Sequence, residues 1–314
     1  MDIIIQLIIV LLTTQGQQRA VGTVVEPPPI RNGAILFSGG CNIDTCEARD
    51  TDIWIGAPNG SKLRKLTEGR FRFEESPVWS PDASMIALTI SEDWPRDGSE
   101  DVYIMSPNGD NLERLYGSSE ADYAGDWSPD GTKMVVVSGR PRNSRLYIIN
   151  ATDGSHAEEV TDGPAHRTDP AWSPDGSKIA FGLGRDYGRD IAVLDLASGE
   201  VTKVTKTHSN SSPSWSPDGT KITFARNVDR NDDGWHIFIM NSDGSNVRRI
   251  KTGTGSWNTN PVYSPNGKWI AFSSGPVGSG YSIFKIRPNG TDVTHLFGGK
   301  RREFFAPDWA PRES

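Results

Sequence analysis

The 314-residue sequence predicts an all-β fold, a six-bladed β-propeller built from four-stranded antiparallel blades. A turn motif centred on Trp-Ser-Pro-Asp-Gly recurs along the chain, and its copies are spaced as propeller blades are. The composition agrees, because 33 Gly and 21 Pro suit short strands joined by tight turns better than long helices. We expect one propeller domain over residues 21–314.

An aromatic residue marks each copy of the repeat, and we call these six residues the marker aromatics. Successive marker aromatics are 48, 45, 43, 48 and 46 residues apart, which is the length of a four-stranded blade. The marker aromatics are Trp79, Trp127, Trp172, Trp215, Tyr263 and Trp309.

Each repeat contains two tight turns with a physical basis. In Ser-Pro-Asp-Gly, Pro presets φ, Asp binds local backbone and Gly accepts a positive φ. A strand follows, as at 179–181, and then a third strand, as at 237–240. A second turn, such as Asn108-Gly109 or Asp153-Gly154, predicts a hairpin to the fourth strand.

The two ends of the chain are predicted to share one blade. Residues 34–37, 53–55 and 63–66 fit second, third and fourth strands, and residues 305–309 would supply the missing first strand. This pairing closes the ring and removes the exposed edges of an open one.

The motif Trp-Ser-Pro-Asp-Gly followed by Lys-Ile-Ala-Phe (residues 172–181, with Ser177 between the two) resembles the repeat of TolB and related propellers, over roughly residues 30–311. The resemblance implies the propeller fold and is weak evidence for a particular function. TolB itself carries an α/β domain before its propeller. We expect this chain to lack that domain.

The first twenty residues predict a signal peptide. Residues 3–12 are apolar apart from Gln6, too short a run to span a bilayer but long enough for a signal sequence. Asp2 stands where a basic residue is typical, so a disordered start is the alternative. No later segment is apolar enough to cross a membrane.

Cys41 and Cys46 lie in one expected loop and would form a disulfide in an oxidising compartment, the alternative being two free thiols. We therefore expect a periplasmic or secreted protein that is monomeric. The formal charge of −7 argues against a nucleic-acid partner.

Variable loops are predicted to converge on one mouth of the central channel, where Arg and aromatic residues would form a binding site for a protein, peptide or anionic ligand. The alternative is that the aromatics pack between blades and the charges only solvate loops. The predicted ligand-binding residues are Arg70, Arg72, Tyr123, His166, Arg167, His208, Trp257, Arg301 and Arg302.

Two metal sites are conceivable. His166 and His208, with Asp169, would fit propeller lyases, although such a site normally needs more imidazoles. Asp229, Asn231 and Asp233, followed by Gly234, match the first half of a calcium loop, but position 240 is Met rather than Glu. A structural Ca²⁺ and an ion-free acidic turn both remain open.

The sequence favours an exported, non-catalytic binding propeller that is associated with the cell envelope. The alternative is a metal-assisted lyase or hydrolase acting on an anionic oligosaccharide. The scarcity of histidine and of paired acid and base residues favours the binding protein.

Overall fold

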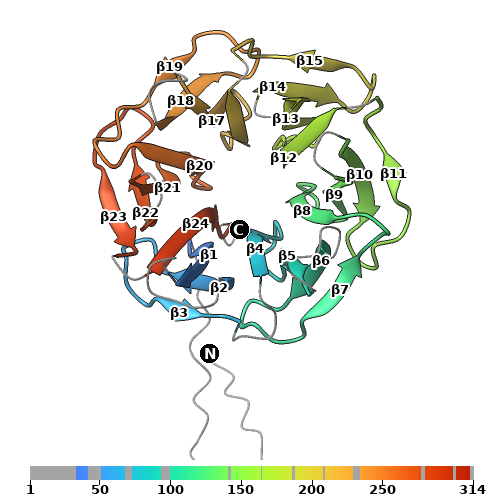
Figure 1. Cartoon of the computed structure of the whole chain (residues 1–314), viewed down its shortest axis with the longest axis horizontal. Helices are drawn as coiled ribbons and strands as arrows, with labels where there is room; N and C mark the ends of the chain where they lie inside the picture. The colour runs from blue at the N-terminus through green and yellow to red at the C-terminus, as the bar shows by residue number, and fades with distance from the viewer. Residues whose placement is uncertain are drawn as a thin grey trace, which may run out of the picture.

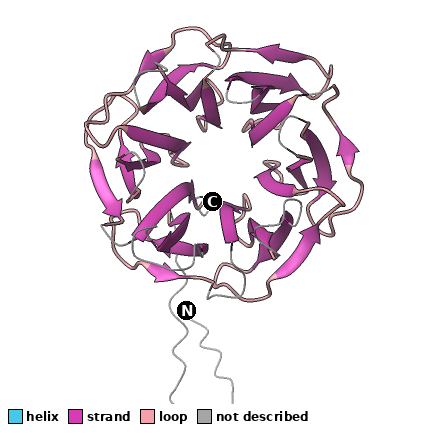
Figure 2. Ribbon diagram, viewed as in Figure 1, coloured by secondary structure: helices cyan, strands magenta, loops and turns pink. Residues whose placement is uncertain are grey.

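The strands surround a central channel, each sheet running from the channel to the outer wall (Figure 1). The computed structural model describes residues 33–41, 51–67, 73–92, 100–140, 143–163, 165–185, 188–207, 209–228, 234–276, 280–299 and 302–311. These residues form strands and loops without a helix (Figure 2). Within these ranges, accordingly, no helix is long and apolar enough to span a bilayer.

Four sheets contain four antiparallel strands each. From the channel outward, the first is β24 (Arg302–Trp309), β1 (Ile35–Cys41), β2 (Thr51–Gly56) and β3 (Arg64–Lys65). The second is β4 (Phe73–Trp79), β5 (Ile86–Ser91), β6 (Glu100–Met105) and β7 (Glu113–Tyr116). The third is β8 (Asp122–Trp127), β9 (Lys133–Ser138), β10 (Arg145–Asn150) and β11 (Glu158–Glu159). The fourth is β12 (His166–Trp172), β13 (Lys178–Arg185), β14 (Gly188–Asp195) and β15 (Val201–Lys203).

The remaining eight strands form one sheet. One antiparallel group is β16 (Asn210–Trp215), β17 (Lys221–Asn227), β18 (Trp235–Asn241) and β19 (Arg248–Arg249). The other is β20 (Trp257–Tyr263), β21 (Ile270–Gly275), β22 (Ser282–Ile286) and β23 (Thr294–Phe297). A single parallel pair, Trp235 with Trp257, joins the two groups.

The predicted propeller of four-stranded antiparallel blades is therefore confirmed, but the predicted count of six separate blades is not. The described chain has four separate four-stranded sheets and one eight-stranded sheet. The physical reason is local, because the backbones of β18 and β20 come close enough at Trp235 and Trp257 to pair.

The C-terminal strand closes the ring as predicted. β24 pairs with β1, from Ile35 opposite Trp309 to Cys41 opposite Arg302. Phe304 lies in the same blade with its ring 4.8 Å from that of Phe37. Phe37 in turn stacks at 5.1 Å on Phe297 of the preceding blade, so aromatic packing reinforces the backbone pairing.

The hydrophobic core lies between neighbouring blades. Leu36 and Ile55 of the first sheet pack in one cluster with Trp79 and Leu88 of the second. All six marker aromatics are at most 8% exposed. Each marker aromatic therefore acts as packing between blades, as the repeat predicts.

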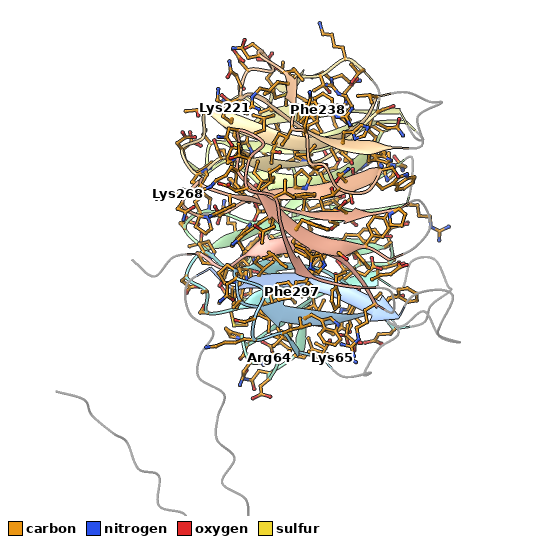
Figure 3. All side chains as sticks on the ribbon, turned by 90° about the vertical axis from the view of Figure 1, so that its left-hand side faces the viewer. Arg64, Lys65, Lys221, Phe238, Lys268 and Phe297 are labelled. Atoms are coloured by element: carbon orange, nitrogen blue, oxygen red, sulfur yellow. The ribbon has the colours of Figure 1, made fainter. Side chains whose placement is uncertain are left out.

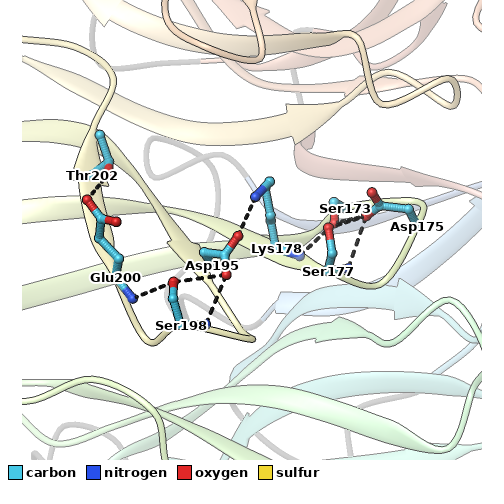
Figure 4. Close-up of polar contacts among 8 residues, drawn as sticks. All are labelled: Ser173, Asp175, Ser177, Lys178, Asp195, Ser198, Glu200 and Thr202. Atoms are coloured by element: carbon cyan, nitrogen blue, oxygen red, sulfur yellow. Dashed lines mark hydrogen bonds and ion pairs between the residues drawn. The ribbon is translucent and has the colours of Figure 1, made fainter.

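The first turn of the repeat that contains Trp172 is held by its own side chains (Figure 4). The Ser173 hydroxyl donates to Asp175 Oδ1 at 2.6 Å, and the Ser177 amide donates to the same oxygen at 3.0 Å. These hydrogen bonds, that of Ser173 first, lower the pKa of Asp175 to about 2. Lys178 then begins β13 and pairs with Asp195 at 2.6 Å.

The second turn docks on the neighbouring blade. Gly154 has φ +68°, and a Cβ there would collide with the Leu115 carbonyl oxygen of the preceding blade. A side chain is thus excluded by both the backbone conformation and the close approach. This turn therefore fixes the spacing of adjacent blades at the outer wall.

Candidate functional site: the central channel and its mouth

The innermost strands of all the blades line one cavity of about 340 Å³ on the channel axis. Equivalent positions of the repeat contribute to it, namely the three residues before each marker aromatic. The lining from these positions is Ser76, Pro77, Val78, Ala124, Gly125, Asp126, Asp169, Pro170, Ala171, Ser212, Pro213, Ser214, Asn260, Pro261, Val262, Ala306, Pro307 and Asp308.

A β-bulge shapes the lining in each blade. Ser212 is left-handed, with φ +51°, and the pairing of β16 with β17 shifts register between Ser211 and Ser214. Ser76, Asp169, Asn260 and Ala306 adopt the same conformation. Proline follows each of these residues, on the innermost strand, where the absent N–H breaks no ladder. The bulge turns the following residues toward the channel.

Two carboxylates in the lining link neighbouring blades. Asp126 accepts the Trp127 amide at Oδ1 and the Trp172 amide of the next blade at Oδ2, both at 2.8 Å. Asp308 accepts the Trp79 amide of its next blade, also at 2.8 Å. Burial raises the pKa of Asp126 to about 6 and the pKa of Asp308 to about 7.

The two aspartates were not predicted from the sequence. The residue before the marker aromatic is otherwise Val, Ala or Ser, so an acid at this position was the available signal. Asp169 also lines the cavity and accepts the Ser212 amide of the next blade at 3.3 Å. Three carboxyl groups therefore line the described channel, together with His166 and Arg167.

Arg167 does not lie in a loop, contrary to prediction. It is in β12, only 4% exposed, and its Nη1 donates to the carbonyls of Ser144 at 2.7 Å and Gly163 at 3.2 Å. Nη2 donates to the Asp162 carbonyl. The guanidinium therefore holds the β11–β12 connection together, and Arg167 also belongs to the lining of the channel cavity.

The other blades have a buried residue at the same place, five residues before the marker aromatic. Asn258 accepts the Thr254 hydroxyl at 2.7 Å and donates to the Gly255 carbonyl at 2.8 Å. Glu74 accepts the Thr67 hydroxyl. The polar residues at this position thus organise the connections into their innermost strands, whereas Phe304 packs on Phe37 and Trp54. The six residues are Glu74, Asp122, Arg167, Asn210, Asn258 and Phe304.

A second cavity, of about 510 Å³, adjoins the channel at the end where the innermost strands begin. We call it the mouth groove. Trp235 and Trp257 lie in it side by side, because they form the pair that joins β18 to β20. Burial and then the charge of Glu303 raise the pKa of Tyr281 to about 12. The lining is Thr168, Asp169, Arg189, Ser211, Ser212, Trp235, Trp257, Thr259, Asn260, Tyr281, Glu303 and Phe305.

The predicted binding residues are distributed unevenly over this site. Trp257 lines the mouth groove, whereas Tyr123 and His166 line the channel. These three lie in β20, β8 and β12 rather than in loops, because the innermost strands begin earlier than predicted. Arg302 lies in β24, exposed, with its Cζ 4.7 Å from the centre of the Trp54 ring.

Other predicted residues lie outside the described ranges. These are Arg70, Arg72, His208 and Arg301, the calcium candidates Asp229, Asn231 and Asp233, and Cys46; the side chain of Cys41 is likewise not described. Within the described residues, no three His, Cys, Asp or Glu side chains are grouped so that they could hold a metal ion.

The fold and the lined channel define a β-propeller with a polar channel and an aromatic groove at its mouth. The model of the TolB beta propeller domain family matches residues 155–314, just over half of the chain. The chain belongs to this TolB β-propeller family.

Known proteins agree with this assignment. A protein TolB homolog from Chlorobium luteolum is 32% identical over 130 residues, which cover 40% of this chain and 28% of the relative. The chain therefore aligns with less than a third of that relative's length. The crystal structure of TolB from Acinetobacter baumannii superposes with a TM-score of 0.75 at 20% identity, covering 89% of this chain and 67% of that one.

An oligogalacturonate lyase from Vibrio parahaemolyticus has a similar fold at 15% identity, with a TM-score of 0.52 over 86% of this chain and 74% of that one. At this level of identity the likeness concerns the fold alone.

Proposed function

We propose that this protein is a non-catalytic binding propeller of the cell envelope that recognises a peptide segment of a partner protein at the channel mouth. The mouth groove carries the proposal, because it combines four aromatic side chains with Arg189, Glu303 and several amide and hydroxyl groups. Aromatic and Arg anchors in a recessed pocket are what binding hot spots are made of.

The groove and the channel would each recognise a different part of the bound peptide. The two adjacent tryptophans, Trp235 and Trp257, offer apolar surface to side chains of the peptide. Asp169, which lines both the groove and the channel, favours a basic side chain of the peptide at that point. Arg70, Arg72 and Arg301 remain proposed contacts at the rim of the same mouth.

The proposal is tested by comparing the two faces of the propeller. A partner isolated by affinity to residues 21–314 should bind at least about 30-fold more weakly to Trp257→Ala and Tyr281→Ala, since losing such an anchor costs about 2 kcal/mol or more. Lys133→Ala, an exposed change beside a Ser-Pro-Asp-Gly turn, is the control. Normal binding by the groove variants and loss of binding in the control would show that the partner binds the face of the Ser-Pro-Asp-Gly turns instead.

Export to the periplasm is part of the same proposal. Residues 1–20 would be removed as a signal peptide, and Cys41 and Cys46 would form a disulfide. Mass measurement of the exported protein should show no alkylatable thiol before reduction and two afterwards. Two free thiols before reduction would contradict the disulfide.

We also propose that Asp229, Asn231 and Asp233 bind a structural Ca²⁺. Calcium at about 100 times its Kd would stabilise the folded state by about 2.7 kcal/mol. Millimolar calcium should raise the Tm, and Asp233→Ala should abolish the increase. Identical melting curves in calcium and in chelator would contradict the site.

The lyase or hydrolase alternative depends on His166 and His208. An enzyme of this kind would lose turnover of an anionic oligosaccharide in His166→Ala, whereas a binding propeller would show no turnover to lose.

A further inference from the structure

Charge is separated across the propeller. The ranges 51–66, 235–251 and 282–297, which hold the third and fourth strands of three consecutive blades, contain eight Lys and Arg against three Asp and Glu. The equivalent ranges 100–116, 145–160 and 188–204 contain four Lys and Arg against ten Asp and Glu. One half of the outer wall is therefore basic although the chain is acidic.

The basic half is continuous around the ring. Figure 1 places β19, β23 and β3 along one side, and Figure 3 views that side, with Arg64 and Lys65 at its lower end and Lys268 at its left edge. We call the cations of this side the basic wall. They are Lys62, Arg64, Lys65, Arg248, Arg249, Lys251, Lys268, Lys285 and Arg287.

Some cations of the basic wall have a structural use. Arg248 donates to the Pro288 carbonyl of the next blade at 2.7 Å, and Lys285 donates to the Pro58 carbonyl of its next blade at 2.6 Å. Arg64 donates to the Pro107 carbonyl at 3.4 Å. These bonds link blades through the Pro-Asn-Gly turns, so packing explains why these three residues are basic.

Packing does not explain the others. Arg249, Lys251 and Lys268 are exposed, and none of them forms an ion pair within the described residues. Arg249 contacts the His236 ring nitrogen at 2.9 Å rather than a carboxylate. Asp52 pairs with Lys65 at 2.6 Å and Asp292 with Arg287 at 3.2 Å, while Asp243 accepts the Ser245 hydroxyl at 2.7 Å. The remaining positive charge is available to a partner.

We propose that the basic wall docks this protein peripherally on an anionic lipid surface, with the acidic half turned away. The cations of the wall are spread over neighbouring blades, which suits an extended charged surface better than a point ligand. Leu63, Val247 and Val293, each about 40% exposed, lie beside the cations and can enter the headgroup region.

The docked orientation leaves the channel accessible. The basic wall is seen at 90° to the view down the channel, so a surface against the wall does not cover the mouth groove (Figures 1 and 3). The inference is independent of the peptide-binding proposal, since the two use different residues. Either could fail without the other.

Vesicle sedimentation of residues 21–314 tests the inference. The protein should bind vesicles of phosphatidylglycerol and phosphatidylcholine at low salt, and release from them as salt rises. Each basic residue near such a surface contributes about fivefold to binding, so Arg249→Gln, Lys251→Gln and Lys268→Gln together should weaken it on the order of 100-fold.

A control variant carries the same change of net charge on the acidic half. Lys133→Gln, Arg140→Gln and Lys203→Gln together should weaken binding less than about threefold. Equal losses in the two triple variants, or no binding of the unmodified protein to anionic vesicles, would overturn the inference. So would equally tight binding to soluble polyglutamate, which would indicate an acidic polypeptide as the partner. Retained peptide binding by the wall variant shows that the mouth groove is intact.

Discussion

Asp126 and Asp308 show how one position of the repeat makes the stability of the fold depend on pH. In the folded protein their pKa values are raised by burial to about 6 and about 7, against an ordinary value near 4. Between those values the folded state holds more protons than the unfolded chain, so the free energy of unfolding falls as pH rises from about 4 to about 7. The turn aspartates act in the opposite direction. Because the pKa of Asp175 is lowered to about 2, its contribution to the free energy of unfolding is lost as pH falls below about 4.

Asp308→Ser should remove part of this dependence of the free energy of unfolding on pH. Ser214 occupies the equivalent place and accepts the Tyr263 amide of its next blade at 3.4 Å, so a serine can keep the link without a buried charge. Urea unfolding at pH 5 and pH 8 measures the effect. We expect the stability difference between the two pH values to shrink relative to the unmodified protein. Glu113→Gln, an exposed change, serves as control, and an unchanged slope in Asp308→Ser would contradict the assignment.

Arg167→Ala should destabilise the protein. Removing the guanidinium leaves the Ser144 and Gly163 carbonyls without their donor, which costs about 1–3 kcal/mol. Exposed Arg302→Ala should change the free energy of unfolding by less than about 0.5 kcal/mol. Equal stability of the two variants in chemical denaturation would count against the structural role of Arg167.

The sequence could predict the marker aromatics but not the role of Arg167. A Trp before Ser-Pro-Asp-Gly recurs, and its burial follows from the repeat. Five residues earlier the repeat has Glu, Asp, Arg, Asn, Asn and Phe, so no residue type is shared. Their common feature is burial against the preceding connection, which only the three-dimensional structure reveals.

At the scale of the strands, β24 decides whether the ring is closed. Phe304 is 1% exposed among Phe37 and Trp54, and Trp309 is 7% exposed. Deleting residues 304–314 should therefore expose the edge of β1 and lower stability by at least several kcal/mol, with aggregation. Phe304→Ala alone should cost about 3–5 kcal/mol in urea unfolding. A truncated protein that stays monomeric with an unchanged Tm would refute the closure.

The sequence located most strands to within a few residues, because turn chemistry brackets each of them. It failed where two strands from different blades meet. The Trp235–Trp257 pair depends on the distance between blades, about which local periodicity carries no information. The mouth groove was predicted only in part for the same reason, since Tyr281 and Arg189 reach it from strands or turns of other blades.

For the whole molecule, the shared blade makes the topology highly non-local. A circular permutant that links residue 311 to residue 33 and opens between Ser119 and Glu120 makes the β24–β1 pairing local. It should refold faster, because less chain entropy is lost in forming that pair. It should also unfold faster, because no blade is then shared between the ends. Stopped-flow rates measure both, and an unchanged refolding rate would show that closure is not limiting.

Closure by β24 also determines when the first blade can be completed during synthesis. β1 has no inner neighbour until β24, more than 260 positions later, has emerged from the ribosome, so its blade cannot be completed before then. Until then β1 keeps an open edge, which a molecular chaperone can protect from aggregation. The first blade therefore stays incomplete while all the blades between β1 and β24 are being synthesised.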